Sequence, residues 1–235
     1  MADVLRGCFV AGTDTGVGKS LISAALLHIL GNRGLRVAGL KPVAAGMMQV
    51  DGEWVNEDVA LLHRASTVSA TYAEIGPYQL QAACSPHIAA VSENRCVDLK
   101  VILEVAHRLQ ARGDGLVVEG VGGFRVPLGG DWDSADLACA FGLPVMLVVG
   151  MRLGCLNHAL LTTDAILQRG LRCAGWIANV TDPEMLHLDE NIQTLRQWLS
   201  PVPCLGVVSW QPFPEVSEIA RQLDHKGLYG LFCSP

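Results

Sequence analysis

The nine residues Gly12–Ser20, GTDTGVGKS, carry the clearest chemical signal in this sequence. They follow a short apolar run, Cys8–Ala11, and Lys19 begins a helix-like stretch. A strand, a glycine-rich turn, Lys-Ser and a helix form the arrangement that cradles nucleotide phosphates. Backbone N–H groups of the turn and the positive end of the helix face the anion. In that arrangement Lys19 reaches the outer phosphates and the Ser20 hydroxyl binds Mg²⁺.

The match to the phosphate-loop pattern is not strict. Thr13 stands where the pattern has its first glycine, and Gly12 lies one residue earlier. The alternative is a glycine-rich turn that only joins a strand to a helix. The order Gly18-Lys19-Ser20, between an apolar run and a helical stretch, favours the nucleotide site.

Polar or glycine-rich residues also follow the other apolar, strand-like runs of the chain. In open parallel sheets, ligands bind beyond the carboxyl ends of the strands. We therefore expect these residues to converge on one edge of one sheet. They are Lys41–Val43, Glu119–Gly123, Gly150–Gly154, Asn179 and Ser209–Trp210.

Two carboxylates and a lysine have types and positions suited to phosphate chemistry. Glu119 can hold Mg²⁺ opposite the phosphates, since Mg²⁺ takes one or two carboxylates together with phosphate oxygens and water. Asp58, near the start of a helical stretch, is a candidate second carboxylate, although Asp is also common in first helical turns. A fixed ammonium at Lys41 can stabilise a transferring phosphoryl group or a carboxylate. The alternatives are a cap or loop carboxylate for Glu119 and a solvated strand-end lysine for Lys41.

Two further features have both a functional and an ordinary interpretation. Asn179 can hydrogen-bond the edge of a nucleobase, or it can simply cap a turn. The stretch Leu153–His158 opens a helix, and the free backbone N–H groups at its start can bind a substrate carboxylate. An ordinary helix start has the same periodicity, so the pattern leaves both interpretations open.

The order of apolar runs and helical stretches predicts an α/β fold. Strands that alternate with helices indicate βαβ units and a mainly parallel sheet with helices on both faces. With the phosphate loop, this predicts a single P-loop NTPase-like domain over residues 1–235, with a loop at Met47–Val55. The expected strands are Cys8–Ala11, Val37–Leu40, Leu116–Val118, Val145–Val149, Ala174–Ala178 and Cys204–Val208. The expected helices are Lys19–Arg33, Asn56–Ala65, Asp98–Arg112, Ser134–Phe141, Leu156–Gln168, Glu184–Leu199 and Pro214–Leu223.

Composition excludes several classes of partner. Half of the residues are hydrophobic and 17% are charged, which allows a large core. The net charge of −6, without a long basic run, argues against nucleic acid as a partner. The eight cysteines form no Cys-x-x-Cys pair and several lie in apolar runs, so we expect a reducing, cytoplasmic location. No signal pattern opens the chain, and the longest apolar run, Pro144–Val149, is too short to span a bilayer, so no membrane is expected.

Taken together, six stretches resemble the dethiobiotin synthetase family, the ATP-dependent carboxylases of biotin synthesis. They occur in the order that the family has them, and the resemblance covers nearly the whole chain. The stretches are Gly12–Ser20, Lys41–Gly46 (KPVAAG), Ser85–His87 (SPH), Val118–Gly123 (VEGVGG), Leu147–Thr162 (LVVGMRLGCLNHALLT) and Gly175–Asn179 (GWIAN).

The resemblance implies a homodimer that closes a ureido ring on 7,8-diaminopelargonic acid with CO₂ and ATP, through a carbamate and a carbamic-phosphoric anhydride. It implies catalytic roles for Lys41 and Lys19, and Mg²⁺ held by Ser20, Asp58 and Glu119. It implies ATP contacts at Gly16, Val17, Gly18, Lys19, Ser20, Leu21, Asp58, Glu119, Gly120, Val121, Gly122, Asn179, Val180, Ser209, Trp210, Gln211 and Glu215. It implies substrate contacts at Thr15, Lys41 and Ala45, and contacts with the substrate tail from the neighbouring subunit at Leu153, Gly154, Cys155 and Asn157.

Three positions depart from the family pattern. Ala45 stands where the family commonly has a Ser that touches substrate, Gly16 where it often has Glu, and Ser209 where a Pro is usual. None of these changes removes Lys19, Lys41 or Glu119, so the sequence indicates an active relative.

Two other classes share the predicted ATP domain. A switch ATPase of the partitioning and division-site type typically has an extra lysine early in the loop, and none lies between Gly12 and Val17. Such proteins often end in a basic amphipathic tail, whereas residues Gly227–Pro235 carry no charged side chain. An amidoligase of the cobyrinic acid type needs a further glutaminase domain, for which the chain is too short.

Overall fold

A six-stranded parallel sheet forms the centre of the molecule in the computed structural model, which describes residues 5–50 and 52–233. Its strand order is β12-β11-β10-β1-β7-β2, and every neighbouring pair runs parallel. This confirms the predicted α/β, P-loop NTPase-like fold. The strands are β1 (Gly7–Gly12), β2 (Val37–Leu40), β7 (Gly115–Glu119), β10 (Val145–Met151), β11 (Cys173–Val180) and β12 (Cys204–Val208).

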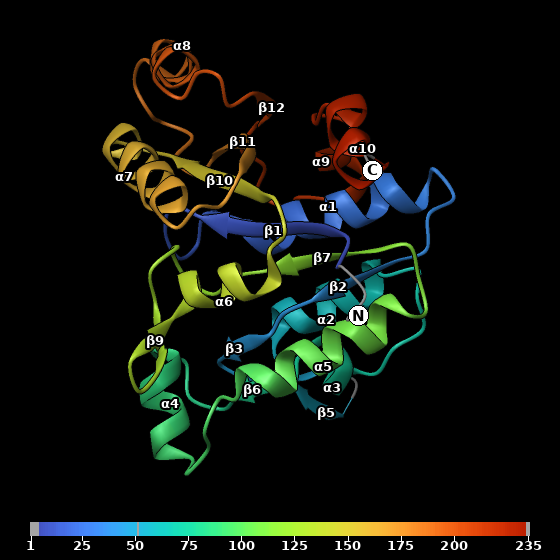
Figure 1. Cartoon of the computed structure of the whole chain (residues 1–235). Coiled ribbons are helices and arrows are strands. Elements are labelled where there is room, and N and C mark those ends of the chain that lie inside the picture. The colour runs from blue at the N-terminus through green and yellow to red at the C-terminus, as the bar shows by residue number, and fades with distance from the viewer. Residues whose placement is uncertain (1–4, 51, 234–235) are drawn as a thin grey trace.

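Helices cover both faces of this sheet (Figure 1). One face packs against α5 (Leu99–Gln110), α6 (Ser134–Phe141), α7 (Cys155–Gln168) and α8 (Leu188–Trp198). Helix α4 (Pro86–Ser92) packs beyond this face, against short strands at Val43–Ala45, Tyr78–Leu80 and Pro127–Gly129. The other face packs against α1 (Lys19–Gly31), α2 (Glu57–Ala65), α3 (Tyr72–Ile75), α9 (Val216–Ala220) and α10 (His225–Cys233).

Strand β1 shows how the sequence specifies two cores at once. Successive side chains of a strand point to opposite faces of the sheet. Phe9 and Ala11 accordingly belong to the apolar cluster on the α5–α6–α7 face, and Cys8 and Val10 to the cluster on the α1–α2 face. A strand buried on both faces must therefore be apolar at every position, as the run Cys8–Ala11 is.

Two small strand pairs and one hairpin lie outside the central sheet. Strands β3 (Val43–Ala45) and β6 (Tyr78–Leu80) pair in parallel, and β8 (Pro127–Gly129) pairs with β9 (Trp132–Asp133). The prediction of a loop over Met47–Val55 is wrong, because β4 (Met48–Val50) and β5 (Glu53–Val55) form an antiparallel hairpin. Gly52, at a φ of +85°, supplies the left-handed backbone that a tight turn needs.

Two predicted helices are shorter than expected. The helix predicted over Glu184–Leu199 begins at Leu188, and the one predicted over Pro214–Leu223 is confined to Val216–Ala220. In the first case, the Asp182 carboxylate accepts a hydrogen bond from the Glu184 N–H, which favours a turn over a helix there.

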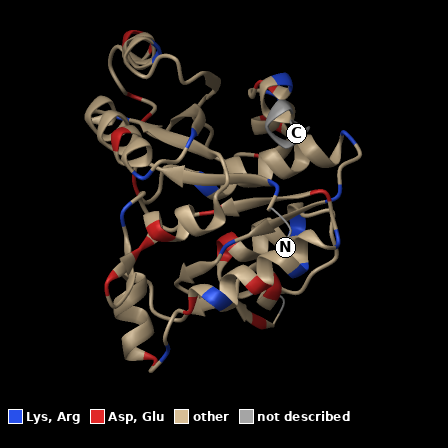
Figure 2. Ribbon diagram, viewed as in Figure 1, with Lys and Arg blue, Asp and Glu red and all other residues tan. Residues whose placement is uncertain are grey.

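Charge and hydropathy in the described part of the chain agree with the composition. Figure 2 shows Lys and Arg interspersed with Asp and Glu along the ribbon. Among the described residues, no helix has both the length and the apolar character needed to cross a membrane.

Candidate active site

The phosphate loop connects the end of β1 to the start of α1. Gly18 has a φ of +87°, and a Cβ atom there would lie 2.3 Å from Asn179 Nδ2, so both backbone conformation and space require glycine. No side chain caps the N-terminus of α1. Its first backbone N–H groups are therefore available to an anion.

Lys19 lies inside this loop rather than in solvent. Its Nζ donates a hydrogen bond to the backbone oxygen of Asp14, 3.0 Å away, and the residue is buried. Burial, together with the charge of Lys41, lowers the pKa of Lys19 to about 8. The Asp14 carboxylate in turn accepts from the Thr15 N–H and pairs with Arg152. These contacts hold the loop and its lysine at the edge of the sheet.

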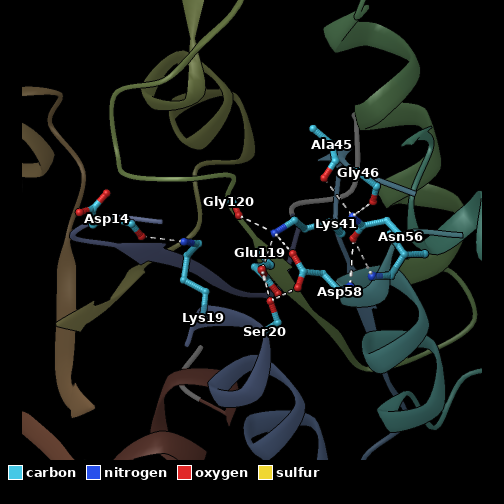
Figure 3. Close-up of polar contacts among 11 residues, drawn as sticks. Asp14, Lys19, Ser20, Lys41, Ala45, Gly46, Asn56, Asp58, Glu119 and Gly120 are labelled. Carbon is cyan, nitrogen blue, oxygen red and sulfur yellow. Dashed lines mark hydrogen bonds and ion pairs between the residues drawn. The ribbon is translucent and has the colours of Figure 1, made fainter. Parts of the chain in front are cut away.

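Four side chains from four elements meet beside the phosphate loop (Figure 3). Lys41 Nζ, directly after β2, lies 2.5 Å from Glu119 Oε1 at the end of β7 and 2.8 Å from Asp58 Oδ2 in α2. It also donates to the backbone oxygen of Gly120, 3.1 Å away. Ser20 Oγ, in the first turn of α1, lies 2.6 Å from Asp58 Oδ1 and 2.8 Å from Glu119 Oε1. The structure thus brings together the strand-end and helix-start residues that the sequence singles out.

Burial and charge pull the pKa values of this cluster in opposite directions. Burial alone would lower the pKa of Lys41, but the charges of Glu119 and Asp58 outweigh it and hold that pKa above its usual value. Complete burial raises the pKa of Glu119, and the Lys41 ammonium opposes this shift. Asp58 is less enclosed, so Lys41 and Ser20 keep its pKa below the usual value despite desolvation. Such strongly perturbed groups at the edge of a cavity are typical of functional sites.

Oxygen atoms in this cluster fit a magnesium ion. The Ser20 hydroxyl has one proton, so it cannot donate to Asp58 and Glu119 at the same time. Glu119 Oε2 is buried without a hydrogen-bond partner. Two carboxylates and a hydroxyl are hard oxygen donors of the kind that Mg²⁺ prefers. In the described part of the chain, no group of three or more His, Cys, Asp or Glu could hold a metal. Mg²⁺ typically takes one or two carboxylates and completes its coordination with water and substrate phosphates.

A cavity of about 880 Å³ opens beside the cluster and the phosphate loop. Its volume suits a nucleotide with a small substrate. Many residues predicted to contact ATP, metal or substrate line it: Thr15, Gly16, Gly18, Lys19, Ser20, Leu21, Lys41, Ala45, Asp58, Glu119, Val121 and Gly122. Of the other predicted residues, Gly120 contributes the oxygen that Lys41 contacts, and the Val17 backbone oxygen accepts from Asn179 Nδ2 at 2.8 Å.

A second pocket, of about 220 Å³, adjoins the first and shares Gly16, Leu21 and Pro214 with it. Five residues predicted to contact the nucleotide line this smaller pocket: Asn179, Val180, Ser209, Trp210 and Gln211. This pocket reaches Gly16 of the phosphate loop and is lined by Trp210, so it suits the flat base of a nucleotide.

Besides Val17 and Gly120, five predicted residues line neither pocket. Leu153, Gly154, Cys155 and Asn157 lie where α7 begins, and the side chain of Leu153 is 94% exposed. Glu215 is exposed and occupies the N-cap position of α9.

Sequence motifs did not indicate several of the residues that line the larger cavity. Val126 and Val216 are apolar residues outside any motif, so no local pattern marks them. Ala83–Pro86 also line the cavity, and the quoted motif Ser85–His87 contained the only signal that could have indicated them. Gly122, at a φ of +61°, passes close to Val126 and Thr15, which ties this wall to the phosphate loop.

Comparisons with known proteins agree with this geometry. Residues 6–215 match a family model described as an AAA domain. The chain is 51% identical to the ATP-dependent dethiobiotin synthetase BioD of Ralstonia nicotianae, over 92% of this chain and 94% of that protein. It is 49% identical to the protein of the same name from Aromatoleum aromaticum, over 93% of this chain and 96% of that protein.

Solved structures with much lower identity share the fold. The cell division ATPase MinD of Pyrococcus furiosus matches with a TM-score of 0.56 at 14% identity, over 97% of this chain and 100% of that one. The septum site-determining protein MinD of Pyrococcus horikoshii, complexed with Mg-ADP, matches with a TM-score of 0.55 at 18% identity, over 97% and 94%. At these identities the similarity concerns the fold alone.

Proposed function

The chain belongs to the family of ATP-dependent dethiobiotin synthetases, ligases of biotin biosynthesis, and on that premise we propose that it converts 7,8-diaminopelargonic acid, CO₂ and ATP into dethiobiotin, ADP and phosphate. One observation carries this proposal. A buried lysine, Lys41, meets two carboxylates, Asp58 and Glu119, in the cavity that the phosphate loop also lines. That arrangement suits phosphoryl transfer to an anionic acceptor, which needs positioning and charge stabilisation.

ATP binds along the edge of the sheet in this proposal. The free N–H groups at the start of α1 and the Lys19 ammonium hold the phosphates. The smaller pocket, with Asn179 and Trp210, takes the nucleobase. Because the Asn179 amide donates to the Val17 backbone oxygen, its position is fixed relative to the phosphate loop.

Ser20, Asp58 and Glu119 are the residues that would hold Mg²⁺, and the fit of their oxygen atoms supports this assignment. The MinD of Pyrococcus horikoshii, which has the same fold, is complexed with Mg-ADP. When bound, the ion would neutralise charge on the β- and γ-phosphates.

The proposed reaction has three steps. An amine of the substrate adds to CO₂ and loses a proton, which gives a carbamate. A carbamate oxygen attacks the γ-phosphorus and ADP leaves, which gives a carbamic-phosphoric anhydride. The second amine attacks the anhydride carbon and loses a proton to solvent, the bond from that carbon to the phosphate oxygen breaks, phosphate leaves and the ureido ring closes. Lys41 stabilises the carbamate and the transferring phosphoryl group, and Lys19 stabilises the phosphates of the leaving ADP.

We further propose that the chain acts as a cytoplasmic homodimer of single-domain subunits, residues 1–235, without nucleic acid or membrane as a partner. In this arrangement Leu153, Gly154, Cys155 and Asn157, at the start of α7, bind the tail carboxylate of the substrate in the neighbouring subunit. In a single chain these residues line neither of the two pockets, which is consistent with that role.

The test is phosphate release from Mg-ATP and bicarbonate, compared with and without 7,8-diaminopelargonic acid. We expect release that depends on the diamine, with dethiobiotin as the product by mass spectrometry. Release that is indifferent to the diamine would overturn the proposal and favour a ParA/MinD-like switch ATPase, which the fold also allows.

A further inference from the structure

Asn56 connects two segments beside the cavity, the start of α2 and the turn at Ala45–Gly46. It precedes α2, the helix that contains Asp58, and its side chain is 7% exposed. Its Oδ1 accepts hydrogen bonds from the backbone N–H of Asp58 at 3.0 Å and of Val59 at 3.4 Å. This is an N-cap, which fixes where the helix begins.

The other end of the same amide holds the backbone that follows Lys41. Asn56 Nδ2 donates to the backbone oxygens of Ala45, 3.2 Å away, and Gly46, 2.6 Å away (Figure 3). Ala45 lines the cavity, and Gly46 leaves β3 in a left-handed conformation with a φ of +88°. The carbonyl of a left-handed turn has no strand partner to orient it, so the amide determines its direction.

The Asn56 backbone is itself anchored. Its N–H donates to Gln79 Oε1 at 2.8 Å, and Gln79 pairs with Ala44 between β6 and β3. Every polar atom of the Asn56 side chain therefore has a partner, either in α2 or in the turn at Ala45–Gly46. A small movement of this residue would move both.

We propose that Asn56 is a positioning residue, which sets the separation between the Asp58 carboxylate and the substrate-side backbone at Ala45–Gly46. It touches no reacting atom in this assignment and acts through the two segments that it holds. The proposal rests on the proposed function only for the identity of the substrate.

Replacement by aspartate separates the two contacts. In the Asn56→Asp variant the carboxylate still caps α2, but it has no donor for Ala45 and Gly46 and repels both carbonyl oxygens. We expect the KM for the diamine to rise on the order of tenfold or more, because small misplacements of substrate-holding groups are costly. The KM for Mg-ATP should stay within about twofold, because the cap and Asp58 remain in place. In the Asn56→Ser variant, the shorter serine side chain still caps α2 but does not reach the turn at Ala45–Gly46. This variant should also raise the KM for the diamine and leave the KM for Mg-ATP nearly unchanged.

A matched control comes from a helix outside the site. Asp98 caps α5 through its contact with the Lys100 N–H and lines neither of the two site pockets. Asp98→Ala should lower the melting temperature and leave both KM values unchanged. If Asn56→Asp keeps the wild-type KM for the diamine, or if Asp98→Ala raises it equally, the proposal is wrong.

A second measurement does not depend on the substrate. Hydrogen–deuterium exchange of backbone amides in residues 43–47 should be faster in Asn56→Asp than in wild type, with no change in α5. Unchanged exchange in residues 43–47 would overturn the positioning role. A wild-type enzyme without diamine-dependent turnover, but with this exchange difference in the variant, would refute the proposed function and leave the positioning role intact.

Discussion

Lys41 Nζ lies 2.5 Å from Glu119 Oε1, inside the protein and between two carboxylates that fit a magnesium ion. The Lys41 ammonium therefore balances the negative charge of Glu119 and Asp58, which a bound metal ion would also balance. A buried carboxylate such as Glu119 is costly without a partner, so Lys41 stabilises its charged form. In the proposed mechanism, Lys41 then stabilises the carbamate and the γ-phosphate, and Asp58 and Glu119 would hold the metal ion.

Lys41→Met should therefore increase the affinity of the protein for Mn²⁺ in the absence of nucleotide. Removing the buried cation leaves Glu119 and Asp58 uncompensated, and we expect Mn²⁺ to bind on the order of tenfold tighter or more than in wild type. Electron paramagnetic resonance of free Mn²⁺ measures this directly. Adding Glu119→Gln to Lys41→Met should abolish the gain, and an unchanged Mn²⁺ affinity in the single variant would contradict the bridging role.

Lys41→Ala should abolish most carboxylation while the protein remains folded. Loss of a charge that stabilises the transition state commonly lowers kcat by about 10²–10³-fold. Diamine-dependent phosphate release measures the effect, with circular dichroism as a check on folding. A variant with the full wild-type rate would show that the assigned mechanism is wrong.

The strand-end residues could be predicted because their positions follow from topology. Once the apolar runs are assigned to one parallel sheet, Lys41, Glu119 and Asn179 must lie at its carboxyl edge. The role of Asn56 could not be predicted, because its partners at Ala45–Gly46 are set by the β3–β6 pair, which has no sequence signal of its own. Val126 and Val216 were missed for a similar reason, since ordinary apolar residues reach the cavity only through tertiary packing.

Gly18→Ala should destabilise the protein more than a left-handed glycine elsewhere. Gly34 has a similar φ of +83°, but a Cβ atom there meets nothing within 4 Å, whereas at Gly18 it meets the Asn179 amide. Gly34→Ala should cost about 1–2 kcal/mol of unfolding free energy from backbone strain alone. Gly18→Ala should cost more than Gly34→Ala and should weaken ADP binding.

The double variant Gly18→Ala/Asn179→Ala tests the cause of this difference. Removing the amide removes the close contact, so the two substitutions should cost less together than the sum of their separate effects. Denaturant unfolding of the four proteins of the cycle measures the coupling. If the two losses of unfolding free energy were strictly additive, the contact with Asn179 would not be the reason that residue 18 must be glycine.

Cysteine reactivity should distinguish the cavity from the core. Burial raises the pKa of the Cys8 thiol to about 12 and of the Cys173 thiol to about 11, so both stay protonated and enclosed at pH 8. Cys84 is exposed and lines the cavity, whereas Cys96, also exposed, does not. Iodoacetamide at pH 8 should label Cys84 and Cys96 and spare Cys8 and Cys173, as measured by peptide mass spectrometry. Mg-ADP with diamine should slow labelling of Cys84 alone; equal protection of Cys96 would contradict this location of the ligands.

Asn157→Asp should weaken diamine binding without disturbing α7. Asn157 is exposed in the first turn of that helix, where aspartate is favourable. Its carboxylate would compete with the substrate tail for the free N–H groups and repel it, so the KM for the diamine should rise while that for Mg-ATP stays constant. An unchanged KM for the diamine would remove the helix start from the substrate site.

Mixing two variants then shows which subunit supplies the tail site. In the proposed homodimer, dimers of Lys41→Ala would lack the proposed catalytic lysine and dimers of Asn157→Asp would lack the proposed tail binding, so each should be nearly inactive at low diamine concentration. If the tail binds to the neighbouring subunit, each mixed dimer has one intact site, and random re-association should restore about a quarter of wild-type activity. If the tail binds within its own subunit, both sites of a mixed dimer are defective. Absence of recovery, with mixed dimers verified by native mass spectrometry, would refute the shared site.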